Sequence, residues 1–306
     1  MAISPSDTKY SIIKEVTAGT TPATPTFIPF DYIPGTQPNF SAQMVSSAVL
    51  KQNRASAGAR KAAYKVDQGL KTQLRRGTHI DAFLESGLSG AFASSVLKAS
   101  NVDSSYTIEK SVTDGTNTYY KRYTGCQVNS VGLSVQASGN AEINFTVLGM
   151  GMSTGNAILT GATYPSVATS TNLMGLDVST LTIAGLTGVV ANQLDLTVTH
   201  NREAQDQFGS PSARAIGTSG FRTVTLKVQF YRTDLSAETL MQNSDSPIAV
   251  SFTIGAAAGS GYTFLLPAAN YTVPMDMTNN SKEMVEVTFT ASFDATTGTD
   301  LQITKN

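Results

Sequence analysis

The side chains best suited to catalysis in this sequence are His79, His200 and Cys126, the whole set of histidines and cysteines. A hydrolytic triad needs a histidine that is oriented by a carboxylate and lies close to a nucleophile. His79 falls in the first turn of a predicted helix, where a solvated turn or a core contact is favoured. His200 ends a predicted strand and is expected at the surface, and Cys126 is predicted to be a small buried apolar residue. We therefore predict no catalytic residue and no enzymatic activity.

The sequence also lacks the residue patterns of a metal site or a cofactor site. One cysteine and two histidines are too few soft ligands for a typical structural zinc site, and one cysteine excludes a disulfide within the chain. Residues 149–155 place three glycines after a strand, but the spacing G-x-G-x-x-x-G is not that of a phosphate-binding loop. We interpret this stretch as a flexible exit from a first domain. No metal and no cofactor is expected.

A basic segment, residues 51–76, carries eight Lys or Arg residues against one acid, Asp67. A single-strand nucleic-acid binder would interleave aromatic side chains with these charges, and Tyr64 stands alone. A protein-binding loop that orders on assembly is the more economical interpretation. Residues 18–25 are similarly predicted to form an extended arm that needs a neighbour to fix it. The predicted contact residues of the basic segment are Lys51, Arg54, Arg60, Lys61 and Lys65.

The composition indicates a surface that is covered by other subunits. Charged residues make up 14% of the 306 residues, against about 25% in an average soluble domain. A net charge of −1 excludes recruitment of nucleic acid or acidic lipid by bulk charge. The start of the chain lacks a secretion signal, and no stretch approaches about 18 uninterrupted apolar residues. We expect a protein that is neither exported by that route nor membrane-spanning.

The chain carries an internal repeat. Residues 70–76 are echoed by residues 226–232, with Leu, Lys, Gln and the final Arg identical. Three further matches keep the same order along the chain: residues 56–60 with 210–214, 105–108 with 251–254, and 141–146 with 285–290. Four collinear matches predict a duplicated domain.

Each half is predicted to consist mostly of strands with one helix. Apolar residues alternate with polar ones over residues 131–135, 143–147, 194–198, 226–230 and 285–293. The pair Asp114-Gly115 favours a hairpin turn. In the first helix Thr78 is the expected N-cap with Asp81 in the capping-box position, and the second helix is capped by Asp234. The predicted apolar face of the first helix is Ile80, Phe83, Leu84 and Leu88.

These elements predict a mainly β fold of two tandem β-sandwich domains, each with one packed α-helix. The predicted domains are residues 1–172, with the extended N-terminal arm, and residues 173–306. The first carries 14 basic and 10 acidic residues, whereas the second carries 7 basic and 12 acidic residues. Opposite charge suits alternate placement around a ring, although ordinary drift explains the same difference.

One further pattern is carried by six stretches: residues 14–23, 28–32, 77–85, 106–110, 123–129 and 148–149. Together these stretches resemble the tail tube (major tail) proteins of long-tailed, siphovirus-type bacteriophages. The resemblance covers residues 9–153 and reaches the second half only through the repeat.

The resemblance implies a structural virion protein without an active site, whose β-sandwich rings stack into the hollow tube through which the genome leaves. It is similar to the tube protein of type VI secretion. Single-domain relatives form hexameric rings, so two copies in one chain imply a homotrimer with pseudo-hexameric symmetry. Edge strands of neighbouring domains would then join into a continuous inner barrel. The basic loop and the N-terminal arm are expected to reach the next ring.

The implied partners are the chain itself, the tape measure protein, the tail terminator and the distal tail proteins. Double-stranded DNA would pass through the lumen without specific binding. The implied location is the virion tail, with assembly in the cytoplasm of the host bacterium.

Two other classes share this composition. A discrete phage surface module, such as a receptor-binding or capsid-decoration sandwich, would remain a small oligomer. A carbohydrate-active or hydrolytic enzyme would need a carboxylate pair or triad in one cleft, and the absence of tryptophan counts mildly against a sugar-stacking site.

Overall fold

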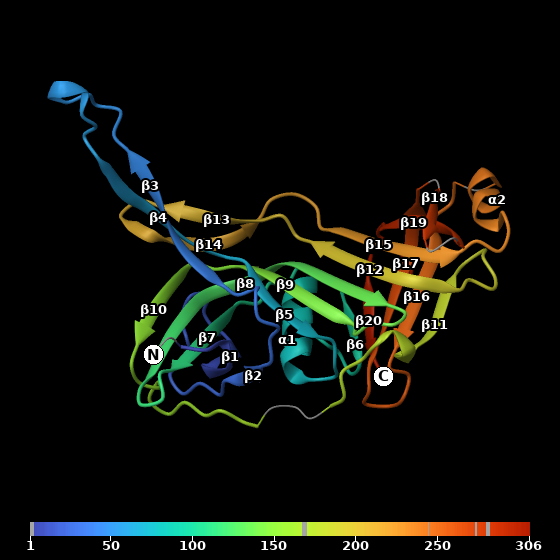
Figure 1. Ribbon diagram of the computed structural model, residues 1–306, viewed down its shortest axis with the longest axis horizontal. Helices are drawn as coiled ribbons and strands as arrows, with labels where there is room; N and C mark the ends of the chain where they lie inside the picture. Colours follow the sequence, from blue (N-terminus) through green and yellow to red (C-terminus); the bar gives the residue numbers. More distant parts are fainter. Residues whose placement is uncertain (1–2, 167–169, 244, 273, 280–281) are drawn as a thin grey trace.

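The computed structural model describes residues 3–166, 170–243, 245–272, 274–279 and 282–306 and confirms a mainly β fold (Figure 1). The first half contains β1 (Thr8–Lys14), β2 (Ile28–Phe30), β3 (Asn39–Ser46), β4 (Ala59–Asp67), β5 (Gly69–Gln73), α1 (Thr78–Leu88), β6 (Val96–Lys98), β7 (Tyr106–Thr113), β8 (Thr118–Gln136), β9 (Glu142–Leu148) and β10 (Gly151–Gly155). The second half contains β11 (Val178–Ile183), β12 (Ala191–Thr199), β13 (Arg202–Gln207), β14 (Ser210–Thr218), β15 (Thr223–Tyr231), α2 (Ser236–Asn243), β16 (Ile248–Ile254), β17 (Tyr262–Tyr271), β18 (Met275–Asn279), β19 (Lys282–Ala291) and β20 (Gln302–Lys305). Short 3-10 helices occupy Pro5–Asp7, Gln52–Arg54 and Gly175–Asp177.

Antiparallel pairing gives the two halves the same strand order. In the first half β1 pairs with β7, β7 with β8, β8 with β9, and β9 with β5. In the second half β11 pairs with β16, β16 with β17, β17 with β19, and β19 with β15. The last strand of each series is the Leu-Lys-x-Gln strand, and a helix follows it in both halves.

Strand β8 connects the halves because it is long enough to pair with strands of the first half at its start and with β12 of the second half at its end. Its first part pairs with β7 and β10. Its last seven residues pair with β12, and residues 130–134 among them also pair with β9. Strand β20, close to the C-terminus, pairs with β17 and with β6 of the first half. All but four strands therefore lie in one hydrogen-bonded sheet system, and one hydrophobic core runs through both halves.

Both predicted helices are present, with a different start for the first. The apolar face of α1 is buried as predicted, against aromatic residues that include Phe145 and Tyr106. The expected N-cap is wrong, because Gly77 occupies that position without a side-chain cap. Asp81 binds Arg76 and Lys305 instead of closing a capping box. In the second half Asp234 accepts a hydrogen bond from the Ser236 amide at 2.9 Å, as expected of a helix-capping aspartate.

Turns and connections account for the remaining differences. The Asp114-Gly115 hairpin turn is confirmed, since Gly115 has φ +95° and the Asp114 carboxylate accepts from the amides of Thr116 and Asn117. The predicted flexible exit at residues 149–155 is wrong, because it forms β10 against β8.

The segment at residues 18–25 lies along its own chain instead of extending from it. Gly19 donates to Glu15, the amide of Thr163 donates to Pro25, and the adjoining Phe27 is fully buried.

Candidate functional site

Two hairpins project from the body of the molecule (Figure 1). Strands β3 and β4 with their connection, residues 39–67, form the longer one, which we call the arm. Strands β13 and β14 form a shorter hairpin in the second half, and β14 contacts β4 at the base of the arm. In sequence, the arm and the shorter hairpin each immediately precede the Leu-Lys-x-Gln strand of their half.

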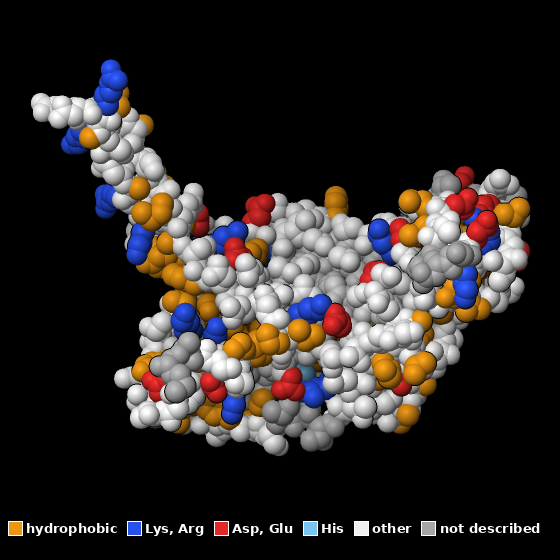
Figure 2. Space-filling model, in the orientation of Figure 1, with side chains coloured by type: hydrophobic (Ala, Val, Ile, Leu, Met, Phe, Trp, Pro, Cys, Tyr) orange, Lys and Arg blue, Asp and Glu red, His pale blue; other side chains and the backbone are white. Residues whose placement is uncertain are grey.

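The five predicted contact residues all lie on the arm and are exposed. Lys51 and Arg54 are in its tip, while Arg60, Lys61 and Lys65 are on β4. Figure 2 shows Lys and Arg side chains along the arm. The prediction of one continuous loop is wrong at its end, because β4 begins at Ala59 and pairs Arg60 with Val45.

Apolar side chains on the arm are exposed beside these cations. Met44 and Val45 are each 54% exposed, and Leu50 at the tip is 81% exposed. Lys65 forms an ion pair with Asp67, with 3.4 Å between the charged atoms. The arm thus presents cations and apolar groups together, the chemistry of a protein-binding surface.

A broad sheet surface joins the halves. Strands β5, β9, β8, β12, β15 and β19 are hydrogen-bonded in that order. Alternate residues such as Phe145, Leu133, Leu196 and Leu226 point into the core and are buried. We call the opposite side the open face. It consists of Gly69, Lys71, Gln73, Ser130, Gly132, Ser134, Gln136, Glu142, Asn144, Thr146, Gln193, Asp195, Thr197, Thr199, Thr223, Thr225, Lys227, Gln229, Glu286, Thr288 and Thr290.

Charges on the open face are few and occur in pairs. Lys71 Nζ lies 2.6 Å from the Glu142 carboxylate on the neighbouring strand, and Lys227 Nζ lies 3.5 Å from that of Glu286. In both halves the glutamate stands directly opposite the glutamine of the Leu-Lys-x-Gln strand and diagonal to its lysine. The repeated segments 70–76 and 141–146 therefore lie on neighbouring strands, and so do their counterparts 226–232 and 285–290. The fifth charge of the face, Asp195, stands opposite Lys227.

Arg202 forms a deeply buried set of polar contacts between the halves. Its side chain is 0% exposed and donates to the Val128 carbonyl at 3.0 Å, the Ser89 hydroxyl at 2.9 Å and the Asp103 carboxylate at 2.8 Å. Further bonds reach Gln127 and the Ser86 carbonyl. The guanidinium therefore satisfies one carbonyl in the last turn of α1 and one on β8, and it fixes the start of the β13–β14 hairpin.

A second polar cluster holds the C-terminal strand against α1. The Asp81 carboxylate accepts from the Tyr262 hydroxyl at 2.8 Å and from Arg76 at 3.0 Å, and Lys305 Nζ lies 2.7 Å away. Sequence patterns did not reveal these contacts or that of Arg202, because the partners other than Arg76 come from distant segments.

The three candidate catalytic side chains are buried and lie apart. His79 makes the predicted core contact, with its ring edge-on to Phe30, and burial together with the Arg75 charge lowers its pKa to about 4. The surface prediction for His200 is wrong: it is 3% exposed, its Nε2 lies 2.6 Å from the Gly87 carbonyl, and burial lowers its pKa to about 4. Cys126 is buried as predicted, and burial raises the pKa of its thiol.

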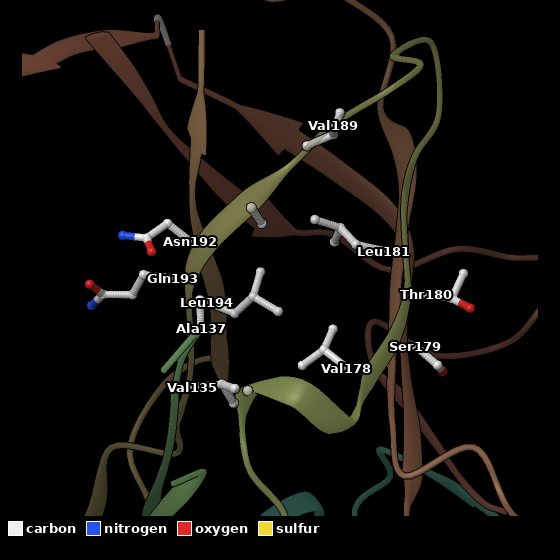
Figure 3. Close-up of a pocket in the computed structure, with 12 residues that line it drawn as sticks. Val135, Ala137, Val178, Ser179, Thr180, Leu181, Val189, Asn192, Gln193 and Leu194 are labelled. Carbon is white, nitrogen blue, oxygen red and sulfur yellow. The ribbon is translucent and has the colours of Figure 1, made fainter. Parts of the chain in front are cut away.

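A hollow of about 260 Å³ opens between β11 and β12 (Figure 3). Val135, Val178, Leu181 and Leu194 point into it, whereas Asn192 and Gln193 point away. Its described lining holds no ionisable side chain, so it offers no acid, base or metal ligand. Within the described ranges no three His, Cys, Asp or Glu residues cluster as metal ligands, and no helix is both long and apolar enough to cross a bilayer.

Comparison with known proteins gives one assignment. A search of curated proteins found no match. The family model described as phage tail tube protein matches residues 5–295, nearly the whole chain. The resemblance seen in the first half thus extends through the second. The projecting arm has the chemistry of a protein-binding surface, and the chain belongs to the phage tail tube protein family.

Proposed function

We propose that three copies of this chain form a closed ring and that such rings stack into the tail tube through which the phage genome is delivered. The observation that carries the proposal is the shared strand order of the two halves, each ending in a Leu-Lys-x-Gln strand and a helix. An internal duplication accounts for it, and three duplicated chains supply six similar units around one axis.

The junction between the halves suggests how chains join. Within the chain, β8 accepts β12 as a neighbour over seven residues, and β12 leads into the β13–β14 hairpin. In the second half β18 pairs with β19, and Met275 of β18 stands opposite Glu286 just as Ser134, near the end of β8, stands opposite Glu142 of β9. In the described part of the chain β18 pairs with no strand other than β19. In the first half residues 33–38 lead into the arm, and the Ile33 amide donates to the Lys71 carbonyl at 2.7 Å. We place residues 33–38 of one chain beside β18 of the next chain. This contact between chains would repeat the contact of β12 with the end of β8 within one chain.

The same placement orients the two candidate surfaces. The open face lines the lumen, where double-stranded DNA passes without specific binding. The arm, with Lys51, Arg54, Arg60, Lys61 and Lys65, leaves the barrel and contacts a neighbouring subunit or ring. Its positive charge suits the acidic second half of another copy. The other proposed partners are the tape measure protein, the tail terminator and the distal tail proteins.

Negative-stain electron microscopy of the purified protein tests the proposal, with or without a tail initiator complex. Tubes whose end-on class averages show three-fold outlines are expected. Discrete small particles under both conditions would contradict assembly into a tube, and rings of six chains would contradict the role given to the duplication.

Charge reversal tests the arm. Arg54→Glu with Lys61→Glu is expected to shorten or abolish tubes, because two exposed cations of the arm are inverted. The matched control is Lys9→Glu with Lys121→Glu, which makes the same change at exposed positions of β1 and β8 on the body. Equal tube lengths for the two variants would contradict an assembly role for the arm.

A further inference from the structure

The open face carries both of its lysines in contact with a carboxylate. Lys71 is paired with Glu142 and Lys227 with Glu286. The Glu286 carboxylate is also held by Gln229 Nε2 at 2.8 Å, and Asp195 stands opposite Lys227. Among the residues listed for the open face, three carboxylates therefore oppose two ammonium groups, and the next cation along β19, Lys282, lies over the Tyr231 ring.

Stability does not explain why both halves have this pair. The lysine side chains are 37% and 53% exposed, and the ion pairs lie on the surface. An exposed pair of this kind contributes about 0 to 1 kcal/mol. The pair nevertheless occupies the same register position in each half, with glutamate opposite glutamine and diagonal to lysine.

The remaining side chains of the face avoid strong contacts with a polyanion. Apart from the five charged residues, those named above are Ser, Thr, Asn, Gln and Gly. The next ring on this side, Tyr231 at the end of β15, is contacted by Lys282 Nζ at 5.3 Å from its centroid, so the middle of the face has no aromatic ring on which a base could stack. In Figure 2 the hollowed upper edge between the arm and the opposite end is largely white, the colour of uncharged polar groups and backbone. Unpaired lysines would be the main source of phosphate binding on such a surface.

We propose that Glu142 and Glu286 mask Lys71 and Lys227 so that duplex DNA slides over the open face without being retained. The proposal rests on the proposed function, since it takes this face as the lumen wall. A carboxylate within 3.5 Å competes with DNA phosphate for the same ammonium group and leaves the face slightly acidic. DNA then releases few counterions on contact, and the adhesion that depends on counterion release stays weak.

Neutralising the two glutamates tests the masking. The full-length Glu142→Gln, Glu286→Gln variant is mixed with a fluorescent duplex of about 20 base pairs, below the protein concentration at which tubes form. Its affinity in low salt is expected to rise on the order of tenfold above wild type. The slope of log affinity against log salt steepens by up to about 2. Duplex should also protect Lys71 and Lys227 from chemical acetylation, with Lys51 and Lys61 of the arm as internal references.

Two further variants make the result specific. Glu203→Gln with Asp206→Asn produces the same change of net charge on exposed β13 residues and is expected to change affinity by less than about twofold. Adding Lys71→Gln and Lys227→Gln to the first variant should restore wild-type affinity. This fourfold variant also identifies any gain caused by misfolding, because such a gain would persist.

The possible outcomes distinguish failure of the masking proposal from failure of the proposed tube function. If the glutamine variant binds DNA no better than the β13 control while the wild type still forms tubes, masking is refuted and the conduit stands. If neither protein forms tubes with the initiator, the proposed function fails instead.

Discussion

Replacing Arg202 by methionine should destabilise the protein more than any exposed arginine substitution, because this side chain is fully buried between the halves. Methionine keeps much of the apolar volume but removes every donor. The carbonyl oxygens of Val128 and Ser86 and the side chains of Gln127 and Ser89 then lose a partner in a buried environment.

The expected loss follows from those contacts. Removing one partner of a buried ion pair costs about 3 to 5 kcal/mol. Asp103 is 39% exposed and can be rehydrated, so its share is small. Each buried neutral acceptor left without a donor costs about 1 to 3 kcal/mol, partly recovered by relaxation. We expect the free energy of unfolding to fall by about 3 to 4 kcal/mol, with a smaller effect, about 1 kcal/mol, for Asp103→Asn.

Urea unfolding followed by circular dichroism measures both effects, with Arg214→Met on the exposed surface of β14 as the matched control. The control should stay within about 0.5 kcal/mol of the wild type. If Arg202→Met costs no more than Asp103→Asn, the buried hydrogen bonds do not hold the halves together and the reasoning is refuted.

Two more substitutions follow from local geometry. Burial holds the pKa of His200 at about 4 against 6.5 in the unfolded chain, so the unfolded state binds the extra proton and stability falls as pH drops from 6.5 to 4, by about 2 to 3 kcal/mol for this residue. His200→Gln should flatten the pH dependence of the unfolding free energy over that interval, and an unchanged slope would count against the burial argument. At Gly69 an added Cβ would lie 1.6 Å from the Phe145 carbonyl oxygen, so Gly69→Ala should cost about 1 to 3 kcal/mol in thermal unfolding by displacing β5 from β9. Gly132→Ala, on the same face with nothing within 4 Å, serves as control, and equal melting temperatures for the two variants would rule out the close contact.

The sequence alone predicted the core strands with a period-two pattern, the two helices and the family, but not β10 or the start of β4. Period-two patterns such as that of residues 226–230 mark which side chains enter the core, because a strand alternates its faces whatever lies around it. The same locality explains why the Asp114-Gly115 turn and the apolar face of α1 could be predicted. The repeat was visible because both halves keep Leu-Lys-x-Gln at the strand before the helix.

Tertiary structure alone decided what those residues contact. His200 looked like a surface residue because it ends a strand, yet its pairing with β8 places the ring against the Gly87 carbonyl. Arg202 acquires its partners, and Asp81 its partners Tyr262 and Lys305, from segments about 70 to 220 residues away, a separation at which side-chain spacing carries no information. The sequence showed that Lys71 and Glu142 both lie in repeated motifs, but not that they form a pair. Only the register of β5 against β9 shows that they meet, because register depends on how the whole sheet packs on its core.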